Sequence, residues 1–287
     1  MSESFAGHYP IEHRQGEIER LHIQGAAMAP DTRVMLDRIG VKAGWTCLDL
    51  GCGPRGITDL LSERVGPGGR VVGVDKDEGF LKYARANAPA NVEFRHGDAY
   101  ATGLPSASFD LVHMRFIAST AGEPQSLLRE GMRLARPAGV VALQEPDVET
   151  FSCYPPHPAW DRLMAVMLDV FAAVSADVRL AQRLYLMARD TGLSDVHYRP
   201  FLIGIRSTDP MVDHLPATVE SLRSTVLKRG LVSEAEFAIL LAQCRSHLRD
   251  PRTVVRSFMV AQIWGRKPAQ CYGLNLTFEE RQGNSRP

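Results

Sequence analysis

The sequence has no excess of charge of either sign. Its 287 residues include 33 Lys and Arg and 33 Asp and Glu, so the formal net charge is zero. Proteins that hold nucleic acid chiefly through its phosphates usually carry a basic excess or a basic patch. The balance argues against nucleic acid as a partner, although it leaves a local patch open.

Cysteine is scarce and irregularly spaced. Five cysteines occur, and none of them form a CxxC motif or a zinc-finger spacing: Cys47, Cys52, Cys153, Cys244 and Cys271. An odd, dispersed set of this kind argues against a disulfide framework and against a structural zinc site. We therefore predict a reduced protein without a metal centre.

Long apolar runs are also missing. No stretch approaches the roughly 18 residues that a membrane span needs. Residues 1–14 are polar and carry His8, Glu12 and His13 where a signal peptide would need an apolar core. We expect a globular protein in the cytoplasm, with no membrane span.

Strand and helix patterns alternate through residues 30–145. Apolar runs typical of buried strands occur at five places: 46–50, 71–74, 92–96, 110–114 and 140–144. The segments between them have helical spacing or turn residues. Strands joined by helices imply right-handed crossovers, so we predict an α/β fold with a doubly wound, mostly parallel, Rossmann-like sheet.

The flanking regions are less regular. Residues 14–29 have the pattern of an amphipathic helix, and Asp31 can cap a second, short helix that Gly40 ends. After Asp147 the pattern is mainly helical, interrupted by two β-rich stretches. We divide the chain into an N-terminal helical cap (1–41), a core (42–147), a region that completes the sheet and adds a helical lid (148–270), and a tail (271–287).

A glycine-rich motif follows the first predicted strand. Gly51, Gly53 and Gly56 fit the pattern G-x-G-x-x-G, and Asp75 follows Gly56 by 75 − 56 = 19 residues. Glycines permit a tight turn and a close approach of the backbone to a ligand, and an acid at this distance suits a ribose. The motif predicts an adenosine-containing ligand, and by itself it fits a nicotinamide oxidoreductase equally well.

Further acidic residues favour one of these ligands. Asp49 precedes the first glycine by two residues, where a pyrophosphate would gain nothing from a carboxylate but an ammonium group would gain a partner. Asp98 closes the third predicted strand, near the place of an adenine amino group. Two more motifs follow in order, at 109–112 and 134–140.

This ordered set of motifs resembles the class I S-adenosylmethionine-dependent methyltransferases. The resemblance covers roughly residues 42–147, and its most specific part is Leu48–Gly56, which is close to D-x-G-C-G-x-G. Within the class the chain looks most like the small-molecule C-methyltransferases of ubiquinone and menaquinone biosynthesis. The resemblance implies a seven-stranded sheet, S-adenosyl-L-methionine as cofactor and S-adenosyl-L-homocysteine as product.

The resemblance also implies roles for residues near the methionine and ribose parts of the cofactor. The backbone of Gly51, Cys52 and Gly53 would run beside the methionine part, with Asp49 near its ammonium group. Asp75 would accept hydrogen bonds from both ribose hydroxyls. For Asp49 the alternative role is to cap the helix that follows the glycine-rich motif.

A second set of residues is implied near the adenine. Lys76 would lie beside the ring, Asp98 would bind the amino group, and the backbone N–H of Ala99 would point toward the ring. Arg115 would form a wall below the cofactor, with pairing to a nearby carboxylate as the alternative. Plain loop solvation is the alternative for Asp75 and for Asp98.

The amino-terminal segment contributes Tyr9 and Gln24. By resemblance these two side chains would close over the cofactor, and helix packing or surface exposure is the alternative for both.

Two residues at strand ends are candidates for a general base. His113 lies in the fourth predicted strand and Glu145 near the end of the fifth, close to the edge where ligands of α/β proteins bind. A buried structural histidine and a substrate-positioning carboxylate are the alternatives. Residues 116–120 contain no histidine, although many relatives have one there.

The region after Asp147 is predicted to enclose the acceptor. It carries aromatic and methionine side chains at helical spacing, which could equally be plain core: Phe151, Tyr154, Trp160, Met164, Met167 and Phe171. His157, in a proline-rich loop, could lie over the pocket or simply in a turn.

The predicted function is methylation of a small, apolar or aromatic organic molecule, in secondary metabolism. The alternatives are a protein or RNA methyltransferase, an NAD-binding oxidoreductase, and a relative that keeps the cofactor fold without methyl transfer. A homodimer is compatible with the sequence.

Overall fold

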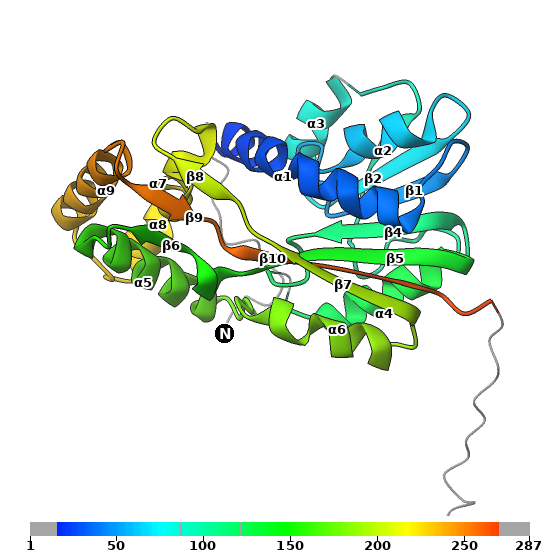
Figure 1. The fold of residues 1–287 in the computed structure, drawn as a ribbon. Helices are drawn as coiled ribbons and strands as arrows, with labels where there is room; N and C mark the ends of the chain where they lie inside the picture. The colour runs from blue at the N-terminus through cyan, green and yellow to red at the C-terminus, as the bar shows by residue number, and fades with distance from the viewer. Residues whose placement is uncertain (1–15, 87, 121, 270–287) are drawn as a thin grey trace, which may run out of the picture.

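The computed structural model describes residues 16–86, 88–120 and 122–269. A seven-stranded sheet forms its centre (Figure 1), with the strand order β3-β2-β1-β4-β5-β10-β7. These strands have the following bounds: β1 Thr46–Leu50, β2 Arg70–Asp75, β3 Val92–His96, β4 Phe109–Arg115, β5 Ala135–Asp147, β7 Ser194–Phe201 and β10 Met259–Arg266. Of these seven strands, six point the same way and β10 runs opposite to them, so the predicted doubly wound, mostly parallel sheet is confirmed.

Helices cover both faces of the sheet. The helices that belong to this layer are α1 Glu17–Ile39, α2 Thr58–Val65, α3 Glu78–Ala86, α4 Pro124–Leu134 and α6 Leu180–Asp190. Apolar side chains of α1 and α2 pack on one face, and those of α4 and α6 pack on the other. Because β1, β2, β4 and β5 are parallel, their carboxyl ends meet at one edge, where ligands of such sheets bind.

A second, mainly helical layer lies beyond that edge, at one end of the molecule (Figure 1). Its elements are η1 Val148–Thr150, β6 Ser152–Tyr154, α5 Pro158–Ala173, β8 Gly204–Arg206, η2 Pro210–Asp213, α7 His214–Glu220, α8 Arg223–Lys228, α9 Glu234–Leu248 and β9 Val254–Arg256. The short strands pair as β6-β9-β8. This layer, which we call the lid, has its own apolar core.

Helix α1 differs from the sequence prediction. We expected a helix over 14–29 and a second one capped by Asp31, but one continuous helix spans Glu17–Ile39 with Pro30 inside it. Its buried positions include Met28, Thr32 and Met35, which form a stripe at three- and four-residue spacing across Pro30. Burial of this stripe outweighs the backbone hydrogen bond that the proline cannot donate. Gly40 ends the helix as predicted.

The limits of the predicted domains are not fixed by these observations, so the boundaries at 41 and 147 stay a prediction. The proposed tail at 271–287 lies outside the described residues. Within the described part of the chain, no helix is long and apolar enough to cross a membrane.

Candidate active site

The glycine-rich segment forms a tight turn at the carboxyl end of β1. Gly51 has φ +67°, and a Cβ atom added there would lie 2.5 Å from Cδ1 of Ile117. The backbone N–H of Gly51 donates to the carbonyl of Val74 in β2 (2.8 Å), which ties the turn to the neighbouring strand. Only glycine fits this position, so we call the turn formed by Gly51–Gly56 the cradle and ascribe its tight start to Gly51.

Asp49 lies beneath this cradle and is almost fully buried, at 2% exposed. Its Oδ2 accepts a hydrogen bond from the backbone N–H of Ile57 (3.2 Å), at the start of α2, and its Oδ1 lies 2.7 Å from Nδ1 of His113. The capping role considered from the sequence is therefore present. A carboxylate can accept further hydrogen bonds, so this role does not exclude an ammonium partner.

Asp75 joins the end of β2 to the cradle. Its Oδ2 accepts from the backbone N–H of Gly53 (2.7 Å), and its Oδ1 accepts from that of Asp77 (2.9 Å). Burial raises the pKa of this half-buried carboxyl, while the two hydrogen bonds oppose the rise. The two acidic residues predicted to hold an ammonium group and a ribose thus both accept hydrogen bonds from the backbone of residues 53–57.

The residues predicted near the adenine lie at the same sheet edge. Asp98 is exposed and accepts from the backbone N–H of Tyr100 (2.9 Å), and Ala99 beside it is buried. Lys76 is exposed, and its carbonyl oxygen lies 3.1 Å from Nε2 of His96. Since β2 pairs with β3 through Asp75 and His96, Asp98 follows directly beside the end of β2.

Arg115 connects the cradle to α1. Its Nη2 donates to the carbonyl of Gly56 (3.2 Å) and lies 3.5 Å from where a Cβ on Gly25 would be. Burial lowers the pKa of the guanidinium, and the nearby Asp49 opposes this effect. Arg115 thus lies where the sequence analysis expected a residue of the cofactor-site wall, next to the glycine-rich turn.

Gln24, on α1, belongs to a buried polar cluster. Its Oε1 accepts from Nη1 of Arg20 (3.4 Å), and the Arg20 guanidinium forms a bidentate ion pair with Glu17 at 2.7 and 2.8 Å. Gln24 is 7% exposed. Its predicted closure over the cofactor stays a prediction, and Tyr9 lies outside the described residues.

His113 lies in a chain of hydrogen bonds that crosses the sheet. Nε2 of His113 lies 3.0 Å from Nε2 of Gln144, so the amide donates to an unprotonated ring nitrogen and Nδ1–H donates to Asp49. Oε1 of Gln144 accepts from Thr32 (3.2 Å) and from Gln262 (2.9 Å). The chain joins β1, β4, β5 and β10 beneath α1, and its histidine and both glutamines are at most 1% exposed.

Glu145 is bound to the backbone on the other side of β5. Its carboxylate accepts from the N–H groups of Ile117 (3.2 Å), Ala118 (2.9 Å) and Ser119 (3.1 Å). Burial raises its pKa to about 7. The role of Glu145 and His113 as bases stays a prediction, and these contacts favour a structural role for both.

Aromatic side chains connect the cradle side of the sheet to the lid. Phe116, directly after β4, contacts Phe258 with ring centroids 5.8 Å apart, and Phe258 contacts Phe151 at 5.6 Å. Phe151 also packs against Trp160 at 4.8 Å. Most of the predicted stripe is core of the lid, whereas Tyr154 is 71% exposed and does not belong to it.

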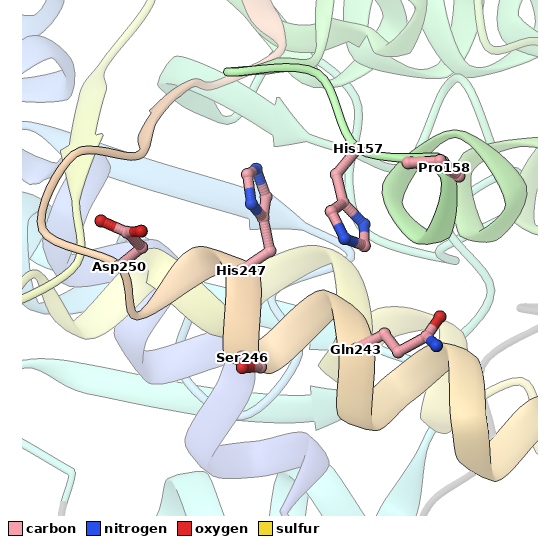
Figure 2. A pocket seen from close by; sticks show the side chains of 6 residues that line it. All are labelled: His157, Pro158, Gln243, Ser246, His247 and Asp250. Carbon is pink, nitrogen blue, oxygen red and sulfur yellow. The ribbon is translucent and has the colours of Figure 1, made fainter.

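His157 lies at a surface hollow rather than over the cradle. Its Nδ1 accepts from the backbone N–H of Ala159 (3.2 Å), which caps α5, and its ring stacks on His247 of α9 at 4.6 Å. Figure 2 shows both rings facing the hollow, which has a volume of about 540 Å³ and is also lined by Gln243 and Asp250. The turn role considered from the sequence is the one observed.

Comparison with known proteins agrees with this geometry. Residues 48–143 match the model of a methyltransferase domain family. The chain is 34% identical to a trans-aconitate 2-methyltransferase of Azoarcus sp. over 204 residues, which cover 71% of this chain and 77% of the relative. It is 27% identical to a demethylmenaquinone methyltransferase of Geobacillus stearothermophilus, over 60% of this chain and 80% of the relative.

Of two further matches, one is partial and the other concerns the fold alone. An uncharacterised 37.1 kDa protein of a Streptomyces fradiae transposon is 35% identical, and the chain spans only 47% of its length. The crystal structure of a putative methyltransferase from Bacillus halodurans superposes with a TM-score of 0.54 at 20% identity, over 83% of this chain and 99% of the other.

Proposed function

Because this chain belongs to the class I S-adenosylmethionine-dependent methyltransferases of the small-molecule type, we propose that it methylates a small, apolar or aromatic organic acceptor. S-adenosyl-L-methionine is the cofactor. The observation that carries the proposal is the glycine cradle held between Asp49 and Asp75. A Cβ added at Gly53 would meet no atom within 4 Å, so there is open space beside this backbone for a ligand chain.

The residues of the cradle fit the parts of this cofactor. Asp49 supplies negative charge for the ammonium group, Asp75 supplies acceptors for the ribose hydroxyls, and Asp98 supplies an acceptor for the adenine amino group. When bound, the cofactor supplies an electrophilic methyl group on a sulfonium. The chain contributes orientation and exclusion of water, which account for much of the acceleration of such displacements.

The aromatic contacts between Phe116, Phe258 and Phe151 support an apolar acceptor next to the cradle. We place the acceptor between the sheet edge and the lid, because the lid core begins at these rings. The zero net charge supports a small molecule rather than nucleic acid as the partner. Secondary metabolism, a cytoplasmic location and a homodimer belong to the same proposal.

Calorimetric titration with S-adenosyl-L-homocysteine and with NAD tests the proposal. Wild-type protein is expected to bind the thioether with micromolar affinity and NAD far more weakly. Asp75→Asn keeps an oxygen that can accept from Gly53 but removes the charge, and we expect at least a tenfold loss of affinity for the thioether. Glu63→Gln is the matched control, since Glu63 is 59% exposed and pairs with Arg33 on the outer surface. Tight NAD binding would instead support an oxidoreductase.

A further inference from the structure

A second buried imidazole, His214, lies outside the hydrogen-bonded chain that holds His113. It begins α7 and is only 8% exposed. Within residues 16–86, 88–120 and 122–269, neither of its ring nitrogens has a hydrogen-bond partner, and only its backbone carbonyl is bonded, to Thr218. His214 is absent from the side chains whose unbonded polar atoms are fully enclosed, so its ring nitrogens border space that a ligand or a water molecule can reach.

The surroundings of His214 are aromatic. Its ring centroid lies 5.7 Å from that of Phe258 and 6.1 Å from that of Phe151. Burial, with the charge of Arg20 nearby, lowers its pKa to about 3, so the ring is neutral at physiological pH. A neutral imidazole offers one hydrogen-bond donor and one acceptor and carries no charge.

His214 is also close to the cofactor side of the molecule. Phe258 contacts both His214 and Phe116, and Phe116 directly follows Arg115 at the end of β4. On the opposite side, α1 packs against α7, and the Arg20–Gln24 contact of α1 lies one residue before Gly25, which touches Arg115. Two separate paths, aromatic and helical, therefore join His214 to the wall of the cradle.

We propose that His214 is a specificity-determining residue that hydrogen-bonds a hydroxyl group of the acceptor. The acceptor class that follows is a flat, apolar molecule with a hydroxyl, such as a phenol or an enol. The Phe151 and Phe258 rings would contact its apolar body, and the imidazole would satisfy the one polar group that the aromatic wall cannot. This inference rests on the proposed function.

The ionic groups nearby are already matched to one another, which agrees with a neutral acceptor. Arg20 is neutralised by its bidentate pair with Glu17, and Ser221 of the segment after α7 adds a hydrogen bond to Glu17 at 3.3 Å. A charged acceptor group would have to disturb this buried pair, whereas a hydroxyl would not.

Two probes that differ only in the polar group test the inference. Protein saturated with S-adenosyl-L-homocysteine is titrated with 2-naphthol and with 2-methylnaphthalene, and binding is followed by fluorescence. Wild-type protein should bind 2-naphthol roughly tenfold more tightly, the usual contribution of one hydrogen bond to a buried group. His214→Phe should remove this preference, and His214→Gln should retain part of it. His197→Phe, at an exposed histidine of β7, is the control and should leave the preference unchanged.

A spectroscopic measurement on the wild-type protein covers the case in which His214→Phe does not fold. The long-range ¹⁵N–¹H signals of the His214 ring, assigned by their loss in His214→Gln, should move when 2-naphthol is added and stay in place with 2-methylnaphthalene. The inference is overturned if these signals do not respond, if His214→Phe keeps the preference, or if wild-type protein binds neither probe while binding the thioether normally. Failure to bind the thioether would contradict the proposed function instead.

Discussion

At the scale of single residues, the cradle depends on what is missing at Gly51. Any side chain there would meet Ile117, and the positive φ disfavours all other residues. The sequence predicted the roles of Gly51, Asp49 and Asp75 because they lie within one short motif and at a fixed distance from it. It could not predict that Asp49 contacts His113, 64 residues away, since that contact requires the strand order.

Two glycine substitutions separate the cost of backbone strain from the cost of a steric clash with Ile117. Gly51→Ala is expected to lower the free energy of unfolding by about 2–4 kcal/mol, because overpacking against Ile117 adds to the cost of the left-handed conformation. Gly53→Ala has a similar φ of +53° but no atom within 4 Å of the added Cβ, so about 1–2 kcal/mol is expected. Urea unfolding measures both, and equal losses would contradict the packing of Ile117 on the cradle.

Glu145 predicts a pH dependence of stability. Its pKa in the folded protein is about 7, above the 4.5 that is ordinary for a glutamic acid, so its contribution to stability is fully present below about pH 4.5. The contribution is lost as pH rises through about 7, by at most roughly 3 kcal/mol.

In Glu145→Gln this loss is absent. The stability of the wild-type protein relative to this variant should therefore fall between pH 5 and pH 8 in urea unfolding. The exposed Glu63→Gln should show a constant difference over the same range. A wild-type advantage that grows with pH would show that the three backbone donors hold the carboxylate charged.

At the scale of elements, two buried glutamines link neighbouring strands through their side chains. Gln144 and Gln262 interrupt apolar runs of β5 and β10, and each carries a hydrogen bond between neighbouring strands beneath α1. A polar residue inside an apolar strand was the available signal in the sequence. The hydrogen-bond partners of these glutamines could not be predicted from the sequence, because β10 and β5 are more than 100 residues apart in the chain.

His113→Ala tests this chain of hydrogen bonds. Removal of the imidazole leaves Oδ1 of Asp49 and the amide of Gln144 without their partner, so we expect a loss of roughly 3 kcal/mol in the free energy of unfolding. Affinity for S-adenosyl-L-homocysteine should also fall, because Asp49 loses its orientation. His197→Ala, at an exposed histidine, is the control. Unchanged stability and affinity in His113→Ala would mean that Asp49 is held by α2 alone.

Helix α1 shows where local rules gave the wrong answer. Pro30 and Asp31 are typical of a helix boundary, yet the helix continues because both halves are buried: Met28 packs in the lid core, and Met35, Leu36 and Ile39 pack on the sheet. Most other predicted strands and helices agree with the structure to within a few residues, since their patterns are local. The short lid strands β6 and β9 are about 100 residues apart in the chain and form only by pairing with each other, so local patterns do not predict them.

At the scale of the whole molecule, the sheet and the lid have separate apolar cores that meet at the carboxyl edge of the strands. The sequence predicted the order of these regions along the chain, because composition and periodicity change after Asp147. It did not predict that β10 lies between β5 and β7, so that the sheet is completed by one strand from the middle and one from the end of the region after Asp147. We propose that cofactor and acceptor bind on either side of this junction.

A crystal structure of the complex with S-adenosyl-L-homocysteine would show whether the glycine-rich turn, Asp49, Asp75 and Asp98 bind the cofactor. The account predicts that the ribose hydroxyls lie within hydrogen-bond distance of the Asp75 carboxylate, with the amino-acid part along Gly51–Gly53 above Asp49 and the adenine beside Asp98. A ligand bound elsewhere, or a ribose held by residues other than Asp75, would contradict it.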